Sequence, residues 1–171
     1  LGNATAEDWA TETQSAAIGG VTSGFNYLMS GESYFPVIEE HLAAARKYSM
    51  IDFGFHPVPS APIHLEELHE YHRKYGIQSF KYFTSYRGDE GKHLNIQGTD
   101  DGFLFRYFQQ VRDIEGGIAN IHPENIEVVW ELRRRLQEAG RDDLKAWEES
   151  RPQVVEAQSA HAVCLYAQEV G

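Results

Sequence analysis

The chain has 171 residues, of which 42% are apolar and 12% aromatic, so it can build one buried core and is not intrinsically disordered. Its 26 acidic residues outnumber the 15 basic ones and give a net charge of -11. This charge argues against a protein that follows nucleic acid phosphates or binds anionic membranes. We interpret it as the surface of a soluble cytoplasmic protein with neither kind of partner.

Cysteine usage and hydropathy also agree with a soluble cytoplasmic protein. Cys164 is the single cysteine, so the chain forms no internal disulfide and no cysteine-based metal knuckle. Its neighbours Ala162, Val163 and Leu165 predict a buried small apolar residue at 164. No apolar run approaches the ~20 residues that span a bilayer, and no signal-peptide pattern opens the sequence.

Helical and strand patterns alternate along the chain. A helix is expected from Thr5 to the glycines at 19 and 20, and strands are expected near residues 20–28, 50–56, 77–83 and 117–122. A helical pattern follows each strand, over residues 36–50, 63–76, 99–114 and 123–140, and a last one covers 152–170. Proline near the starts and glycine at the ends of these patterns agree with helix boundaries. Residues 87–98 and 141–152 are predicted to be polar connections.

Strands that alternate with helices predict an α/β fold with a parallel sheet, whose strands are adjacent in chain order and have their helices on the outer face. Such units either close into a (β/α)8 barrel or form an open doubly wound sheet. No G-x-G-x-x-G or G-x-x-x-x-G-K sequence follows any strand, which weakens the open nucleotide-binding sheet. Because a complete barrel takes ~250 residues, we predict a partial TIM-type barrel of about four consecutive β/α units.

Two stretches carry candidate chemistry at the ends of predicted strands. SFKYFTSYRG contains Lys81 and Tyr86, and GGIANIHPEN contains His122, Glu124 and Asn125. Parallel barrels place their active sites at these C-terminal strand ends. The residues alone still favour a lysine that pairs with a carboxylate or reaches water, and a hydrogen-bonded structural histidine.

Together the two stretches resemble the dihydropyrimidinase and D-hydantoinase family of the amidohydrolase superfamily, and the resemblance extends to AAIGGVTS and ESRPQVVEAQSA. It implies a metal-dependent hydrolase barrel that opens hydantoin or dihydropyrimidine rings with two divalent ions, Zn²⁺ being the expected metal. It further implies that CO2 carboxylates Lys81 to N6-carboxylysine, which bridges the ions, and that His122 binds one of them. Tyr86 is then expected to donate a hydrogen bond to the substrate carbonyl oxygen as negative charge develops.

The surroundings of these residues agree with the resemblance, with one departure. Burial lowers the pKa of a lysine, and only the neutral amine attacks CO2, so an apolar strand favours carboxylation of Lys81. The family pattern after the histidine is a small residue, Glu and Asn, whereas Pro123 stands at the small-residue position. Glu124 is interpreted either as an acceptor that orients His122 or as a carboxylate that favours the next helix N-terminus, and Asn125 as a neighbour of the same site.

The remaining candidates are interpreted as structural. His64, His69 and His72 share a helix with many charged residues, which is typical of a solvated face. His56 ends a strand and could approach the site, but the family takes no metal ligand there. The Arg-Pro pair at 151–152 matches a structural landmark of the family.

The resemblance also indicates which part of the family's catalytic domain the chain corresponds to. The family's paired histidines would lie before Leu1, and its later histidine and metal-binding aspartate beyond Gly171. We therefore expect residues 1–171 to be the central segment of a catalytic barrel domain, inactive alone and part of a homotetramer. Allantoinase and dihydroorotase activities remain alternatives, as does a non-catalytic dihydropyrimidinase-related scaffold, although retention of Lys81 and His122 favours the enzyme.

Overall fold

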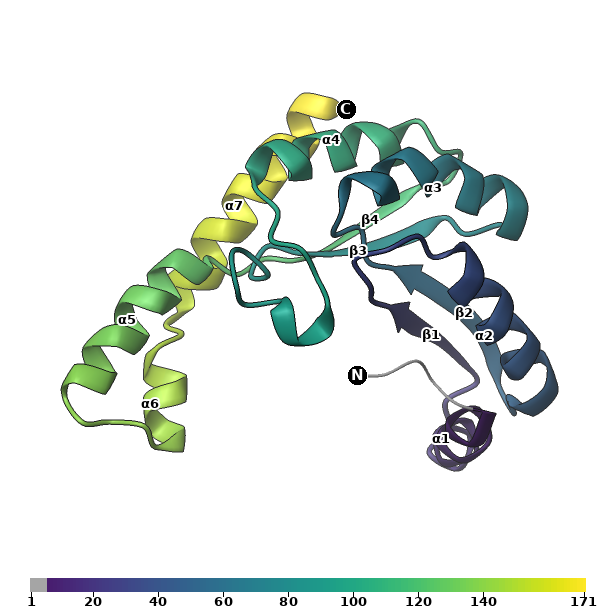
Figure 1. Cartoon of the computed structure of the whole chain (residues 1–171), viewed down its shortest axis with the longest axis horizontal. Coiled ribbons are helices and arrows are strands. Elements are labelled where there is room, and N and C mark those ends of the chain that lie inside the picture. The colour runs from purple at the N-terminus through teal and green to yellow at the C-terminus, as the bar shows by residue number, and fades with distance from the viewer. Residues whose placement is uncertain (1–5) are drawn as a thin grey trace.

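The computed structural model describes residues 6–171 as an α/β structure in which every strand is followed by a helix (Figure 1). The elements are α1 (Ala6–Ile18), β1 (Ser23–Leu28), α2 (Phe35–Tyr48), β2 (Asp52–Pro57), α3 (Pro62–Tyr75), β3 (Ser79–Phe83), a 3₁₀ turn (Lys92–Leu94), α4 (Asp101–Arg112), β4 (Ile118–His122), α5 (Ile126–Glu138), α6 (Leu144–Glu149) and α7 (Gln153–Val170). The predicted strands and long helices are confirmed at their positions; the start expected at Thr5 lies outside the described residues.

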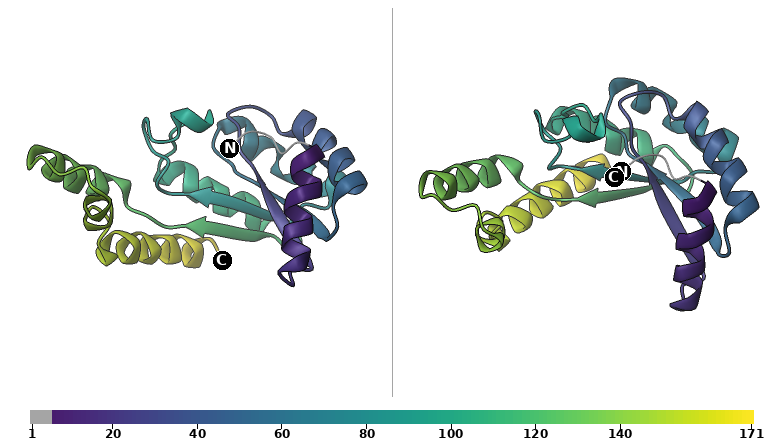
Figure 2. Two further views of the ribbon diagram at one scale, coloured as in Figure 1. Left: turned by 90° about the horizontal axis from the view of Figure 1, so that it is seen from below. Right: turned by 60° about the horizontal axis from the view of Figure 1, so that its bottom comes forward.

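The strands pair in parallel, as predicted, but in two separate pairs. β1 lies beside β2 with Ser23 opposite Asp52, and β3 lies beside β4 with Lys81 opposite Asn120. The continuous four-stranded sheet expected from the sequence is not formed, since the described residues give two two-stranded sheets. Figures 1 and 2 show the reason: the pairs are steeply inclined to one another, so the ladder does not continue from β2 to β3.

Local signals explain where the helices begin and end. α3 begins with Pro62 and is capped at its C-terminus by Gly76, whose φ of 69° is a left-handed conformation that glycine adopts without strain. The side chain of Asp100 accepts from Phe103 N at the start of α4. α6 occupies part of the predicted polar connection, where Asp143 caps its first turn and Ala146 is buried. Six residues are too few for an apolar period to reveal such a helix.

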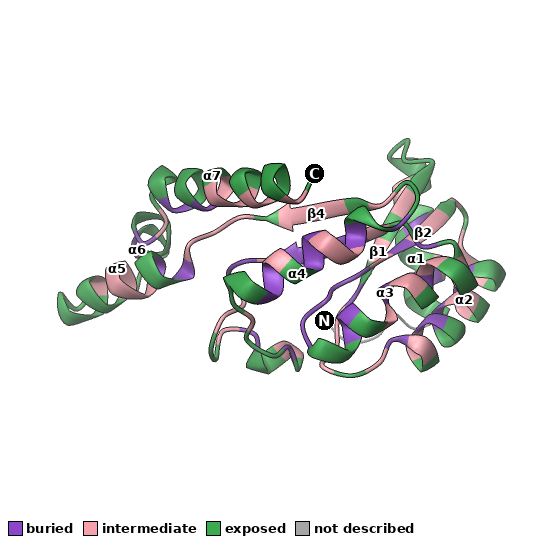
Figure 3. Ribbon diagram, turned by 90° about the horizontal axis from the view of Figure 1, so that it is seen from above, coloured by how far each residue is buried: buried purple, intermediate pink, exposed green. Residues whose placement is uncertain are grey.

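The main core lies between one face of the strands and the helices α1 to α4 (Figure 3). Phe80 and Tyr82 point from β3 toward α4, where Tyr107 donates its hydroxyl to Phe80 O at 2.8 Å and stacks on Tyr82. A smaller apolar cluster of Ile126, Val129 and Val155 joins α5 to α7. The opposite face of the strands is left uncovered by helices, and it carries the candidate residues.

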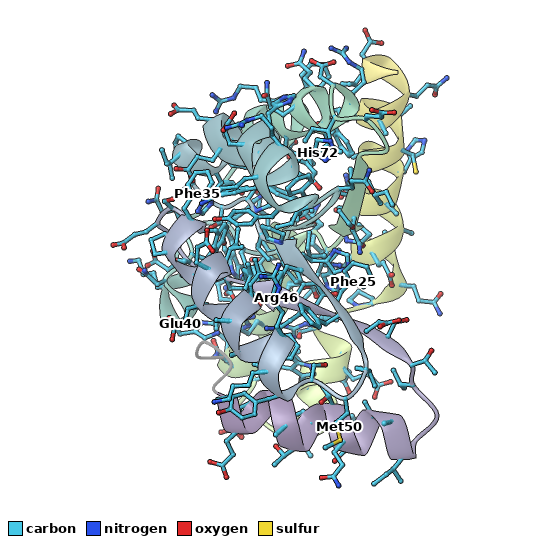
Figure 4. All side chains as sticks on the ribbon, turned by 90° about the vertical axis from the view of Figure 1, so that its right-hand side faces the viewer. Phe25, Phe35, Glu40, Arg46, Met50 and His72 are labelled. Atoms are coloured by element: carbon cyan, nitrogen blue, oxygen red, sulfur yellow. The ribbon has the colours of Figure 1, made fainter. Side chains whose placement is uncertain are left out.

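Two predictions about individual side chains are wrong. Cys164 is exposed, because α7 turns Val155, Ser159 and Val163 toward the body of the molecule and Cys164 away from it. His64 is fully buried rather than solvated. His72 agrees better with the predicted charged face: it is only partly buried and lies on α3 among charged side chains (Figure 4).

No helix within residues 6–171 is both long enough and apolar enough to cross a membrane.

Candidate active site

The alternation of side chains along β3 and β4 sets the geometry of the site. Phe80 and Tyr82 face the helices, so Lys81 and Phe83 face the opposite side of the strand. Phe83 lies directly opposite His122 in the parallel register, and their ring centroids are 5.6 Å apart. Lys81 Nζ lies 4.9 Å from the centre of the Phe83 ring. The structure therefore brings Lys81 and His122 to one face, on either side of Phe83.

Lys81 is buried there without a counter-charge from the described part of the chain. Its side chain is 9% exposed, and burial lowers the pKa of its amine. No ion pair to Lys81 is formed within residues 6–171; instead Nζ lies over the rings of Phe83 and Tyr27. Of the two structural roles open from sequence, pairing with a carboxylate is thus not observed among these residues, and cation–π contact takes its place.

Tyr86 lies just beyond the turn that ends β3 and joins the same group of side chains. Its ring centroid is 5.1 Å from that of Phe83. Partial burial raises the pKa of its phenol, and the carboxylate of Glu124 raises it further, so the group keeps its proton at neutral pH. Tyr86 is therefore a hydrogen-bond donor beside Phe83, the ring that also contacts Lys81 and His122.

Aromatic side chains of β1 and β2 extend this surface. Phe25 stacks on His56 at a centroid distance of 4.4 Å, and Tyr27 lies 6.2 Å from Phe83. Phe25, labelled in Figure 4, belongs to this group of side chains. His56 Nδ1 lies 3.5 Å from Ser79 O, so His56 approaches the site as expected and sits where the two strand pairs meet. We call the surface formed by these rings together with Lys81, Phe83 and His122 the open face.

Glu124 and Asn125 have partners other than His122. Glu124 Oε1 accepts from Arg151 Nε at 3.1 Å, which gives the Arg-Pro landmark a specific role. Asn125 caps α5 by accepting from Val128 N and donates to Gln158 Oε1 at 2.6 Å. The role of Glu124 and Asn125 in supporting His122 stays a prediction.

Two residues that the sequence did not single out hold the site segments in place. Thr84 is buried directly after β3 and binds the segment that follows β4. Glu90 accepts from Trp130 Nε1 at 2.6 Å and from Arg133 Nη1 at 2.8 Å, which fixes the loop after Tyr86 to α5. A polar residue in a polar loop carries no pattern that would reveal such a contact in advance.

A metal centre would find only part of its ligands here. Residues 6–171 contain no group of three or more His, Cys, Asp or Glu side chains arranged to hold a metal ion. His122 is an exposed residue, and it lines a pocket of 270 Å³ with Pro123, Glu124 and the first turn of α7. The described residues therefore form no metal site by themselves, and the role of Lys81 and His122 as metal ligands stays a prediction.

Comparison with known sequences gives a consistent set of relatives, although no model of a known family matches the chain. The D-hydantoinase of Geobacillus stearothermophilus is 29% identical over 99% of the chain, and that of Streptomyces coelicolor is also 29% identical over 99%. The mouse protein named dihydropyrimidinase-related protein 5 is 28% identical over 94% of the chain. The chain spans about a third of the length of the hydantoinases, 35% in each case.

Solved structures give the same result for the fold. A structure described as that of D-hydantoinase superposes with a TM-score of 0.81 and 30% identity over 95% of this chain and 34% of that one. The D-hydantoinase of Bacillus sp. AR9 superposes with a TM-score of 0.83 and 29% identity over 98% of this chain. The similarity in sequence and in fold therefore covers almost the whole chain.

Proposed function

We propose that this chain, which is related in sequence and fold to the D-hydantoinases and dihydropyrimidinases, forms one side of the active site of a metal-dependent cyclic amide hydrolase. We place its four β/α units in a (β/α)8 barrel, an assignment supported by the parallel pairing and by the likeness to solved hydantoinases. The reaction class is hydrolysis of the amide carbon–nitrogen bond of a hydantoin or dihydropyrimidine ring.

The observation that carries this proposal is the environment of Lys81. A lysine that is buried without a carboxylate partner costs free energy unless it loses its charge or is modified. Its neutral amine can bond to CO2, forming a nitrogen–carbon bond and releasing a proton, which yields a carbamate anion. Lys81 would then present oxygen ligands on the face that carries His122, while His122 would donate a ring nitrogen lone pair.

Bound at these residues, two divalent cations, with Zn²⁺ the expected ion, would supply Lewis acidity and lower the pKa of water. Tyr86 would donate its phenolic hydrogen to the amide carbonyl oxygen, where negative charge develops as the carbonyl carbon becomes tetrahedral. The rings of Phe83 and Tyr27 beside Lys81 would limit access of bulk water to the carbamate. Further ligands and a general base would have to come from outside the described residues.

The test uses the whole protein as its gene encodes it, freed of metal with a chelator and then reconstituted with Zn²⁺. Ring opening is measured with hydantoin, dihydrouracil, allantoin and dihydroorotate as separate substrates. We expect turnover of hydantoin or dihydrouracil that disappears with the chelator and returns with Zn²⁺. Absence of turnover with all four substrates in a protein that carries its metal would contradict the proposal.

The second candidate is a non-catalytic scaffold, the alternative expected from the sequence; a protein named dihydropyrimidinase-related protein 5 is among the relatives. It predicts that the same preparation binds no stoichiometric Zn²⁺ and opens none of the rings. Assembly into a tetramer and a cytoplasmic location stay predictions; light scattering on the whole protein tests the first and microscopy of the tagged protein the second.

A further inference from the structure

Thr84 occupies the point at which β4 leaves β3. Thr84 N donates to His122 O at 3.1 Å, which continues the parallel ladder one residue beyond β3. In a ladder that ran on, the next bond would join Glu124 N to the main-chain carbonyl of Thr84. Glu124 N instead donates to the hydroxyl Oγ1 of Thr84 at 2.7 Å. The side chain of Thr84 thus replaces its own carbonyl as the acceptor.

The same hydroxyl is saturated by the segment that carries His122. Its single proton has Glu124 O at 2.9 Å and His122 O at 3.2 Å as backbone acceptors. Ser159 Oγ of α7 lies 3.2 Å from Thr84 Oγ1 and can donate to it. Because the side chain of Thr84 is only 4% exposed, water cannot replace these partners without opening the segment.

Pro123 increases the influence of the bonds between Thr84 and residues 122–124 on the orientation of His122. A proline fixes its own φ and restricts the residue before it to extended conformations, so His122 has little backbone freedom. The orientation of His122 is then set by where the segment is held against β3. Thr84 provides that attachment, and it stands three residues after Lys81 on the same segment of chain.

We infer that Thr84 is a positioning residue whose hydroxyl fixes His122 relative to Lys81, an inference that rests on the proposed function of these two residues. Thr84 touches no reacting atom and acts through the backbone of residues 122–124. Loss of its hydroxyl leaves Glu124 N and Glu124 O without their partner, so the segment shifts and the two metal-binding side chains lose their spacing.

The chain contains a matched control for a buried threonine hydroxyl. Thr13 is 7% exposed; its hydroxyl donates to Trp9 O and accepts from Met50 N at 3.0 Å. It thus ties two backbone segments in the β1–β2 part of the molecule, far along the chain from the candidate ligands. Removal of this hydroxyl should cost comparable stability and leave the site unchanged.

The experiment compares Thr84→Val, Thr84→Ser and Thr13→Val in the whole protein by Zn²⁺ affinity, kcat and KM. Loss of a group that supports a metal ligand costs about 10–100-fold in metal affinity, so we expect Thr84→Val to bind Zn²⁺ at least about tenfold more weakly. Its kcat should fall by a similar factor with KM little changed. Thr84→Ser keeps the hydroxyl and should resemble the parent, and Thr13→Val should alter the melting temperature only.

Amide hydrogen exchange at Glu124 provides a readout that does not depend on metal or activity. We expect faster exchange of this amide in Thr84→Val and parent-like exchange in Thr84→Ser and Thr13→Val. If the parent protein binds no Zn²⁺, the proposed function fails, and the exchange rate alone decides whether the hydroxyl holds the segment.

Three results would overturn the inference. The first is unchanged Glu124 exchange, or unchanged Zn²⁺ affinity, in folded Thr84→Val. The second is an equal loss of affinity in Thr13→Val, which would reduce the effect to general destabilisation. The third applies if Thr84→Val fails to fold: a tenfold loss of Zn²⁺ affinity in Thr84→Ser. This variant retains the hydroxyl, so the inference predicts no such loss.

Discussion

The two strand pairs are built alike but differ in what stands at their C-terminal ends. Both are parallel, and both pack helices on one face and present aromatic rings on the other. β1 ends at Leu28 and β2 at Pro57, both buried, and the ionisable side chain next to these ends, His56, stacks on the ring of Phe25. β3 and β4 end beside Lys81, Tyr86 and His122. The two pairs therefore share one architecture, but the residues that we propose as metal ligands and hydrogen-bond donor lie on the second pair.

The histidines show the same division. His64 Nδ1 accepts from Ser60 N and Ala61 N, and its Nε2 donates to Glu32 O at 2.7 Å. Both ring nitrogens therefore have backbone partners. His122 instead opens onto a pocket and faces Phe83. A buried and saturated imidazole supports a fold, whereas an accessible one is free to bind a ligand.

The largest expected effect follows replacement of Lys81, with Lys74→Ala as control because Lys74 is an exposed lysine paired with Glu39. Removal of a direct ligand should exceed the 10–100-fold that supporting groups cost, so we expect turnover by Lys81→Ala to fall by more than about a hundredfold. A short carboxylic acid such as acetate or propionate should restore part of it by replacing the carbamate oxygens. Steady-state rates with and without the acid provide the measurement.

Turnover in Lys81→Ala within tenfold of that in Lys74→Ala would contradict the role of Lys81 as a ligand. The second strand pair would then carry no more chemistry than the first.

Tyr86→Phe should depress turnover and spare metal. Loss of one hydrogen bond to a developing oxyanion costs about 10²–10³ in kcat, so we expect a fall on the order of a hundredfold. Tyr75→Phe is the control, since Tyr75 OH donates to Glu39 on the surface. Rates and zinc analysis on both variants test this. Normal turnover in Tyr86→Phe, or loss of zinc from it, would show that the phenol has another role.

A smaller effect is expected for the pH dependence of stability. Burial lowers the pKa of His64 in the folded protein, so the unfolded chain binds more protons at mildly acidic pH. The free energy of unfolding should therefore decrease as the pH falls from about 7.5 to about 5.5, through the unfolded value of roughly 6.5. His64→Gln should weaken this dependence, and the control His69→Gln, which replaces a partly buried histidine of the same helix, should not. Urea unfolding at each pH makes the comparison.

Burial also lowers the pKa of His41, so part of the slope should survive in His64→Gln. An identical slope in the parent and in His64→Gln would contradict the assignment of His64 as a structural histidine.

Glu90→Gln should have the smallest effect. The carboxylate of Glu90 is partly buried between Trp130 and Arg133, and ion pairs of this exposure contribute about 1 kcal/mol or less. We expect the free energy of unfolding to fall by about that amount and the fluorescence of Trp130 to change, because a neutral amide oxygen replaces the charged acceptor of its indole N–H. Glu138→Gln, in an exposed pair with Arg134, serves as control. Equal effects in both variants would mean that Glu90 does not fix the loop.

The sequence predicted those features that depend on local periodicity. Strand positions, long helices and the shared side of Lys81 and His122 follow from alternation and from turn residues. The error at Cys164 arose from judging burial by its immediate neighbours, whereas residues three and four apart share a helix face. The burial of His64 depends on the segment around Glu32, whose main-chain carbonyl accepts from His64 across 32 residues of sequence. The roles of Thr84 and Glu90 likewise depend on contacts across about forty residues.

The most direct test of the central claim is detection of the carbamate on Lys81. The whole protein is equilibrated with ¹³C-bicarbonate, and the carbamate carbon is observed by NMR in the parent, in Lys81→Ala and in Lys74→Ala. We predict one carbamate signal in the parent and in Lys74→Ala, and its loss in Lys81→Ala. A parent protein without the signal, or a signal that persists in Lys81→Ala, would contradict the account.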